Sequence, residues 1–391
     1  MDIEALTATS MVSQRRAASD LHRRFMRFLT VAITMAASTL VAVLAPTATV
    51  ASVPRFTHDV LGSVSCPSST MCMALGSEQH KSGQSKALAE QWNGSQWSVV
   101  EPSHSGGVVS CPTSTDACVA VGGRISDWNG ATWTTVPKSV QLHASLDAVS
   151  CVASGQCVAV GEILERPPTS DSPQYYADAS SGLLSGATRW QPVALEQPVD
   201  LTGVSCTSSS FCMAVGSVPF PSLPATLAEE WNGGSWSVVP SPSTGTNSGL
   251  TGVSCTGPSQ CTAVGESGGQ PLVETWDGTT WTVATTPSAS GAALLTVSCP
   301  ASNACMAVGT VTVGPQLENV AFAEQWNGVA WTIVPTGSLP GSTENVLDSV
   351  SCPSAVDCMA VGVDYLAMTK AQTLAEQWNG TSWSQVTSPS P

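Results

Sequence analysis

The chain has 391 residues, of which 42% are hydrophobic and only 10% are charged. Its 28 acidic residues outnumber its 13 basic residues, so the net charge is −15 at pH 7. A charge of this sign argues against nucleic acid and anionic lipid as partners, and the regularly placed apolar residues argue against a disordered chain.

Residues 1–51 have the pattern of a secretory signal peptide. Five arginines, of which Arg27 is the last, precede an apolar run from Phe28 to Ala45, and small residues before Ala51 suit cleavage. The run of about 18 residues could also serve as an uncleaved anchor, so both outcomes stay open. Without the five basic and three acidic residues of this leader, eight basic and 25 acidic residues remain, a net charge of −17. We expect a secreted, extracellular or cell-envelope protein with no membrane span after cleavage.

Residues 52–391 consist of seven copies of one pattern, which start near residues 60, 106, 146, 201, 250, 294 and 347. A Ser-Cys pair marks each copy. From Cys66 to Cys352 there are 286 residues over six intervals, a mean period of about 48. A period of roughly 40–50 residues is typical of four-stranded propeller blades.

Each copy contains four short segments rich in β-branched and aromatic residues and bounded by Gly, Pro, Asn and Ser, as strands are. No segment after the leader shows a helical period. The sequence therefore predicts an all-β fold, a seven-bladed β-propeller with four antiparallel strands per blade. In the clearest copy the four segments are the one ending in Val-Ser-Cys206, Cys212-Met-Ala-Val-Gly216, Leu227-Ala-Glu-Glu-Trp231 and Trp236-Ser-Val-Val-Pro240.

Asn-Gly or Asp-Gly pairs stand between the third and fourth segments of six copies. These residues tolerate positive φ, so they favour tight hairpins. Twelve of the thirteen tryptophans flank these turns in pairs, from Trp92 and Trp97 to Trp378 and Trp383. Such regular placement indicates packing within the sheets rather than one binding cage. The third copy lacks the turn and the pair and holds Trp190 instead.

All 14 cysteines belong to the repeat, two per copy, with five intervening residues or, in the second copy, six. Pairs of this kind are expected to oxidise after export, whereas structural zinc sites typically place about two or four residues between ligands. One disulfide within each copy is thus favoured over metal. The predicted bridges are Cys66–Cys72, Cys111–Cys118, Cys151–Cys157, Cys206–Cys212, Cys255–Cys261, Cys299–Cys305 and Cys352–Cys358.

The second copy combines the apolar strand Val119-Ala-Val-Gly122-Gly123 with Trp128 and with Trp133, which opens the last strand before Pro137. In these features the repeat, from about residue 60 to 391, resembles that of kelch and galactose-oxidase-like propellers. It differs from the kelch repeat because most copies have one glycine where kelch has two, and because each copy has an added cysteine pair. The hairpin Trp276-Asp277-Gly278 is similar to the Asp-box of sialidase-like propellers but lacks a residue between Asp and Gly.

The resemblance implies the propeller fold. It does not carry over the copper chemistry of galactose oxidase, because the sequence has no matching set of Tyr and His ligands. We therefore expect no metal and no cofactor, although an unidentified metal in the central channel stays open.

In a four-stranded blade, the connections between strands two and three lie on the opposite side of the disc from the hairpins between strands one and two. Here the 2–3 connections vary in length and chemistry, so the binding face is expected on that side. The third copy carries Tyr175, Tyr176 and Asp178 in its insertion, and Tyr365 lies in the corresponding loop of the seventh copy. They are candidates to stack on and hydrogen-bond a sugar or peptide; a plain surface loop is the alternative.

A glutamate two residues before the third-segment tryptophan recurs in five copies. Paired carboxylates act in glycosidases, but one residue per blade would be spread around a ring. A structural hydrogen bond is therefore the favoured role. The residues are Glu90, Glu229, Glu274, Glu324 and Glu376.

The rest of the catalytic inventory is small. The sequence has no nucleophile elbow, phosphate loop or dinucleotide fingerprint. We expect a monomeric binding or scaffold protein, secreted or on the cell surface, that recognises an extracellular protein or carbohydrate through its variable loops without catalysis. The alternatives are an extracellular glycan-active hydrolase or lyase, and an envelope protein with a purely structural role.

Overall fold

The computed structural model describes residues 58–79, 85–100, 107–112, 117–122, 124–135, 144–165, 174–183, 191–194, 200–218, 225–242, 247–315, 317–337, 341–367 and 370–389. The chain divides into two units, Met1–Pro54 and Arg55–Pro391, and all described residues belong to the second. The predicted signal peptide and Trp190 lie outside these residues. Within the ranges above, no helix is long and apolar enough to cross a membrane.

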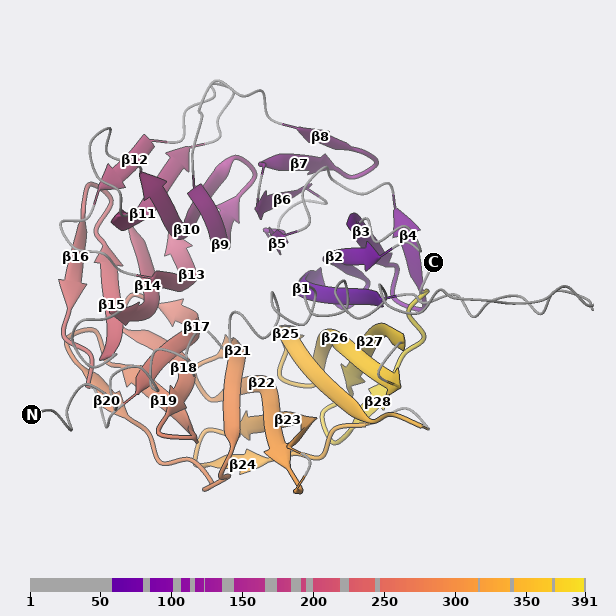
Figure 1. Cartoon of the computed structure of the whole chain (residues 1–391). Coiled ribbons are helices and arrows are strands. Elements are labelled where there is room, and N and C mark those ends of the chain that lie inside the picture. Colours follow the sequence, from indigo (N-terminus) through magenta and orange to yellow (C-terminus); the bar gives the residue numbers. More distant parts are fainter. Residues whose placement is uncertain are drawn as a thin grey trace, which may run out of the picture. The chain divides into compact units, whose positions relative to one another are not determined.

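The described part of the chain forms seven successive four-stranded sheets, called blades one to seven (Figure 1). Blades one to four are β1 (His58–Ser68), β2 (Met71–Gln79), β3 (Ser85–Trp92), β4 (Trp97–Val100); β5 (Gly107–Ser110), β6 (Ala117–Gly122), β7 (Ser126–Asn129), β8 (Trp133–Thr135); β9 (Ala144–Ala153), β10 (Gln156–Glu165), β11 (Gln174–Leu183), β12 (Gln191–Ala194); and β13 (Asp200–Ser208), β14 (Phe211–Val218), β15 (Ala225–Trp231), β16 (Trp236–Val239).

Blades five to seven complete the second unit. Their strands are β17 (Ser248–Gly257), β18 (Gln260–Ser267), β19 (Gln270–Trp276), β20 (Trp281–Val283); β21 (Ala292–Ala301), β22 (Ala304–Val313), β23 (Glu318–Trp326), β24 (Trp331–Ile333); and β25 (Glu344–Ser354), β26 (Asp357–Ala367), β27 (Lys370–Trp378), β28 (Trp383–Gln385).

Strands pair in chain order within every blade, so each blade is an antiparallel meander. One parallel bridge between His58 and Ala371 joins β1 to β27 and makes the first and seventh blades a continuous sheet. The predicted all-β, seven-bladed propeller with four antiparallel strands per blade is confirmed.

The seven blades close into a ring (Figure 1). The first strand of each blade contacts the first strand of the next, and β25 of blade seven contacts β1 of blade one. The serine of every Ser-Cys pair lies at these contacts, where its Oγ accepts a hydrogen bond of 2.9–3.0 Å from the cysteine N–H of the next blade. Seven such bonds form a closed circuit, the last from Cys66 N–H to Ser351 Oγ.

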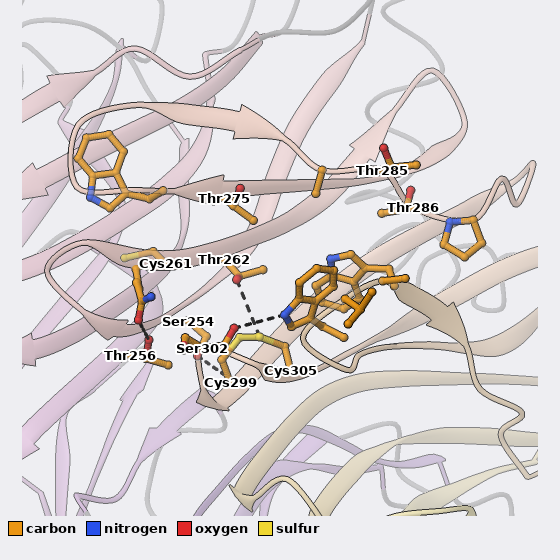
Figure 2. Close-up of a pocket in the computed structure, with 18 residues that line it drawn as sticks. Ser254, Thr256, Cys261, Thr262, Thr275, Thr285, Thr286, Cys299, Ser302 and Cys305 are labelled. Carbon is orange, nitrogen blue, oxygen red and sulfur yellow. Dashed lines mark hydrogen bonds between the residues drawn. A yellow bond between two sulfur atoms is a disulfide. The ribbon is translucent and has the colours of Figure 1, made fainter.

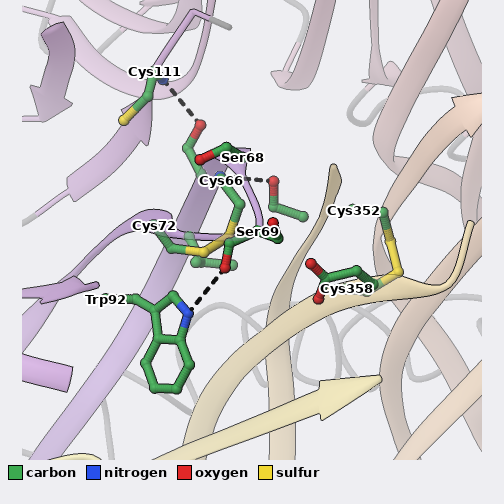
Figure 3. The surroundings of a disulfide bond; sticks show 12 residues. Cys66, Ser68, Ser69, Cys72, Trp92, Cys111, Cys352 and Cys358 are labelled. Carbon is green, nitrogen blue, oxygen red and sulfur yellow. Dashed lines mark hydrogen bonds between the residues drawn. A yellow bond between two sulfur atoms is a disulfide. The ribbon is translucent and has the colours of Figure 1, made fainter. Parts of the chain in front are cut away.

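This circuit explains why serine recurs before the first cysteine of each copy. A hydroxyl satisfies the N–H of an inner strand whose edge has no strand partner within its own blade. Figure 3 shows the bond at Cys111 beside the Cys66–Cys72 disulfide. Ser63, Thr296 and Ser349 add a second bond of this kind, each from the backbone N–H of a valine in a neighbouring blade.

All seven predicted disulfides form, one per blade, and none of the 14 cysteines, all of which the structure describes, is free. Each joins the first strand of a blade to the second. The second cysteine of each pair is buried, with an exposed fraction of at most 5%. The second cysteine of every bridge therefore lies in the packed interior, whereas Cys151, Cys206, Cys255 and Cys299 are only half-buried.

The Asn-Gly and Asp-Gly pairs form the predicted tight hairpins. Their glycines have φ values between 89° and 97°, a region that side chains avoid. The side-chain oxygen at the first position accepts backbone N–H groups two and three residues on, as Asn93 Oδ1 does from Ser95 and Gln96 at 3.0 Å each. Six tryptophan pairs stack across these hairpins with ring centroids 5.4–6.0 Å apart, so they serve packing.

The core is divided among the gaps between successive blades. Each buried apolar cluster joins one blade to the next; for example, Val264 and Val273 of blade five pack with Leu294 and Phe322 of blade six. A single blade cannot bury both of its faces, and the ring covers each face with a neighbour. The residues that fill these gaps consequently decide where the ring is tight and where it is open.

Two segments that the sequence suggested as loops are strands. In blade three, β10 and β11 pair over ten residues, from Gln156 opposite Leu183 to Glu165 opposite Gln174. In blade seven, β26 runs to Ala367, so Tyr365 also lies in a strand. Extending the ladder satisfies backbone groups that a loop lying against the sheet would leave without partners.

The glycine that ends Cys-x-Ala-Val-Gly has a steric cause, because a Cβ at Gly309 would lie 2.1 Å from the carbonyl oxygen of Ala293. We expect Gly309→Ala to lower the free energy of unfolding by about 3 kcal/mol or more, since backbone must move. Chemical denaturation would measure this. Gly257→Ala is the matched control, because nothing lies within 4 Å of the added carbon. Equal stability of the two variants would refute the steric explanation.

Candidate functional site

The predicted ligand-binding residues of the third copy lie in β11. Tyr175 and Tyr176 pair with Leu164 and Ile163 of β10, and Asp178 lies two positions further along. The structure describes the backbone of these three residues but not their side chains. Their role in binding therefore stays a prediction.

Tyr365 lies in β26 of blade seven with a half-buried ring. Its carbonyl oxygen accepts hydrogen bonds from the Thr343 N–H at 2.8 Å and the Thr343 Oγ1 at 2.9 Å. Blade seven does not neighbour blade three in the ring. The structure therefore does not bring Tyr365 together with the other predicted tyrosines in one site.

Acidic side chains surround Tyr365. Burial, followed by the negative charges of Asp348 and Glu344, raises the pKa of the Tyr365 hydroxyl. Burial also raises the pKa of Asp348 to about 7, and burial together with Glu318 raises the pKa of Glu344. Among the described residues, no group of three or more His, Cys, Asp or Glu has an arrangement that could hold a metal ion. This acidic patch is a place where a carboxylate could exchange a proton near neutral pH.

The five repeated glutamates are buried between blades, each with an exposed fraction of at most 1%. Burial raises the pKa of every one of them to about 7. Three accept hydrogen bonds from the segment that follows the fourth strand of the preceding blade. These bonds run from Ser388 Oγ to Glu90 at 2.7 Å, from Ser241 Oγ to Glu274 at 2.7 Å and from Gly337 N–H to Glu376 at 3.0 Å.

Three of these glutamates therefore join neighbouring blades through hydrogen bonds. All five are buried and are distributed over five of the seven blades, which argues against two of them flanking one substrate bond. The Ser388 bond also ties the end of blade seven to blade one and supports closure of the ring.

A groove of about 710 Å³ separates blade five from blade six (Figure 2). Its lining includes Thr262 and Trp276 of blade five and the Trp326–Trp331 pair of blade six. Thr262 Oγ1 lies 3.9 Å from Cys305 Sγ, so the Cys299–Cys305 disulfide forms part of the floor. Pockets that hold small molecules have volumes of about 300–1,000 Å³. This groove is the candidate binding site.

Among the described residues that line this groove there is no Asp, Glu, Lys, Arg or His. It includes hydroxyl groups, the amide of Gln260 and indole rings. Ser302 and Val329, which also line it, belong to the β21–β22 and β23–β24 turns. Those turns lie on the side opposite to the 2–3 connections, where the sequence predicted the binding face, and Tyr365 is not among the described lining residues.

The repeat itself contains the signal for this groove, which sequence reasoning missed. The residue after the second cysteine is Met73, Met213, Met306 or Met359 in four blades, each with an exposed fraction of at most 2%. Each methionine packs in a cluster with residues of the next blade. The shorter Thr262 takes that place in blade five, and it is the polar exception among seven equivalent positions.

The residue before the second cysteine varies more widely among the blades. Met71 in blade one and Phe211 in blade four are buried, with exposed fractions of 8% and 6%, and pack in clusters with the following blade. Blade five has the exposed Gln260 instead. Gln260 is therefore not particular to this gap, because blade three has the exposed Gln156 and blade seven has Asp357 at the same position, and Thr262 is the substitution that sets the groove apart.

The sequence matches no protein-family model and no curated protein. One similar solved structure is YCF48 bound to a D1 peptide, with 14% identity over 82% of this chain and 92% of that chain and a TM-score of 0.51. A fucose-specific lectin from Aleuria aurantia has 12% identity over 86% of this chain and 97% of that chain, with a TM-score of 0.42. A PL25 ulvan lyase has 10% identity over 81% of this chain and 94% of that chain, with a TM-score of 0.47. At 14% identity the likeness to YCF48 concerns the fold alone, and TM-scores below 0.5 support no argument. The propeller fold is shown, whereas the kelch resemblance stays a prediction.

Proposed function

We propose that this chain is an extracellular binding protein that holds a carbohydrate or protein ligand without changing it chemically. The observation that carries the proposal is the uncharged groove between blades five and six. Pockets with apolar walls and a few directed polar groups are typical of ligand recognition. Catalysis of bond cleavage would instead need an acid, a base or an activated nucleophile beside the ligand, and the described lining has Ser and Thr hydroxyls without a base to activate them.

Seven disulfides are consistent with a protein outside the cell, because such bridges persist in oxidising compartments. The predicted signal peptide also indicates a location outside the cell. The charge of −15 further favours a neutral or basic ligand over nucleic acid. A rigid ring that presents fixed side chains suits a binding role, since little conformational entropy is lost when the ligand binds.

A glycan-active enzyme is the second candidate function. The acidic patch on blades six and seven favours it, because Glu318 raises the pKa of Glu344 and Tyr365 lies next to both Glu344 and Asp348. An interacting pair of carboxyl groups is the arrangement that glycoside hydrolysis uses. This candidate places the chemistry on a different part of the ring from the groove.

A screen of the oxidised protein against neutral and acidic glycans and peptides separates the two functions. We expect retention of at least one ligand class with no released product, because the groove has no reactive group. The measurement scores retention and product in the same wells. Product release that Glu344→Gln abolishes would replace the binding function with the enzymatic one. Neither retention nor product in any well would contradict both.

A further inference from the structure

We propose that the groove between blades five and six binds a neutral saccharide. This inference rests on the proposed binding function and names the ligand class for one site. The groove is defined here by Thr262, Gln260, Trp276, Trp326, Thr285 and Thr286 among its lining residues. Figure 2 shows the labelled hydroxyl-bearing residues around the Cys299–Cys305 disulfide.

The groove is open at a position, Thr262, that the other six blades fill with an apolar side chain. Four of the other blades fill the corresponding gap with a buried methionine, and blades two and three fill it with Val119 and Val158, whose exposed fractions are 6% and 9%. Thr262 fills less of the gap than methionine and adds a hydroxyl. An empty apolar gap between blades would cost contacts on both walls, whereas the hydroxyl and amide groups in this lining can form hydrogen bonds with a polar ligand.

The polar groups are arranged for a ligand with many hydroxyls. Thr256 and Gln260 are exposed at one rim and join through a bond of 3.4 Å from Thr256 Oγ1 to Gln260 Oε1. Thr285 and Thr286 lie at another part of the lining. Hydroxyl and amide groups both donate and accept hydrogen bonds, and this matches the alternating donors and acceptors of a sugar ring.

The apolar part of the lining suits the C–H face of a sugar. Trp326 is half-buried, and its ring lies 6.0 Å from that of the buried Trp331. The Trp326 Nε1–H donates to the carbonyl oxygen of Ser302 at 3.3 Å, which fixes the indole plane. A fixed aromatic face offers large contact area at little entropic cost.

The absence of charge in the lining selects among saccharides. The described lining residues include no cation that could pair with a uronate or sulfate, and the chain as a whole is strongly acidic. Moving an anionic ring into this groove would remove its hydration without compensation. A neutral hexose or pentose chain is therefore favoured over an acidic polysaccharide.

The test compares the full oxidised protein with Thr262→Met and Gln260→Phe, which reproduce the side chains of blade four. The probes are cellohexaose, xylohexaose and mannohexaose, with a trigalacturonate as the acidic probe, measured by calorimetry. We expect wild type to bind at least one neutral probe, and each variant to bind it roughly tenfold or more weakly, about 1.4 kcal/mol. The thermal midpoint of Thr262→Met should not fall, because methionine fits the same place in four other blades.

Thr134→Met is the matched control, because it adds the same side chain at an exposed position on β8 of blade two. It should bind as wild type does. If Thr262→Met does not fold, Gln260→Phe at the exposed rim decides the question alone.

The outcomes separate this inference from the proposed function. Neutral-glycan binding that both groove variants keep unchanged would overturn the groove assignment and leave the binding function intact. Binding of trigalacturonate alone would overturn the ligand class but not the binding function. No binding of any probe would contradict both.

Discussion

Raising the pH from about 5 to about 8 is expected to destabilise this protein by several kcal/mol. Glu90, Glu229, Glu274, Glu324 and Glu376 are buried, and burial raises the pKa of each from 4.5 to about 7. Between these two pH values the folded chain holds protons that the unfolded chain releases, so the free energy of unfolding falls as the pH rises. The loss is complete above about pH 7, and below about pH 4.5 this source of stability is fully present.

The size of the effect follows from the pKa differences. One unit of pKa corresponds to about 1.4 kcal/mol, so each buried glutamate contributes on the order of 1–3 kcal/mol. Two neighbouring acids increase these pKa shifts. After the larger effect of burial, the charge of Asp59 raises the pKa of Glu90, and the charge of Asp364 raises the pKa of Glu376. Hydrogen bonds from Ser388 and Gly337 work against these shifts.

Glu324 is the best single residue for a test, because neither of its buried carboxylate oxygens has a hydrogen-bond partner among the described residues. Glu324→Gln should raise the free energy of unfolding at pH 8 by about 1–3 kcal/mol and change it little near pH 5. Denaturation curves at a series of pH values would measure this. The control Glu230→Gln, at a half-buried position, should keep the pH dependence of the parent. A Glu324→Gln protein with the parent's slope would show that Glu324 is already ionised when buried.

Reduction of the seven disulfides is expected to unfold most of the chain near 37 °C. Each bridge closes a loop with a sequence separation of six or seven residues, which stabilises the folded state by about 2 kcal/mol on the chain-entropy model. Seven such bridges together contribute about 14 kcal/mol, comparable to the total stability of about 5–15 kcal/mol for a typical domain. The bridges also lie beside the Ser–Cys bonds that close the ring.

The measurement is thermal unfolding with and without a phosphine reductant, after equilibration in mild denaturant because the second cysteine of each pair is buried. Removing one bridge with Cys255→Ala and Cys261→Ala should lower the free energy of unfolding by about 2 kcal/mol. A control in which only the exposed Val238 of blade four becomes Thr should be unaffected. If full reduction left the midpoint unchanged, the bridges would contribute nothing beyond the packing between blades.

Much of the fold was predictable because its signals are local. The Asn93-Gly94 turn and its equivalents specify hairpins through positive φ at glycine, and each cysteine pair is too close in sequence to find another partner easily. The number of Ser-Cys pairs then predicts the number of blades. The extent of β11 and β26 was less predictable, because pairing in the ladder, rather than the composition of the segment, decides where those strands end.

The binding site depended on information that no single copy contains. Thr262 differs visibly from Met213 and Met306 at the same repeat position, but only the ring shows that this side chain faces the next blade and leaves the groove open beside Cys305. Likewise, the glutamate before each tryptophan acquires its raised pKa from burial by a neighbouring blade. The hairpins and disulfides within a copy depend on residues close in sequence, so the sequence alone determined them. Contacts between copies produce the closure of the ring through Ser351 and Cys66, the burial of the glutamates and the open groove. Only the tertiary structure decided these three features, because the contacting residues are far apart in the sequence.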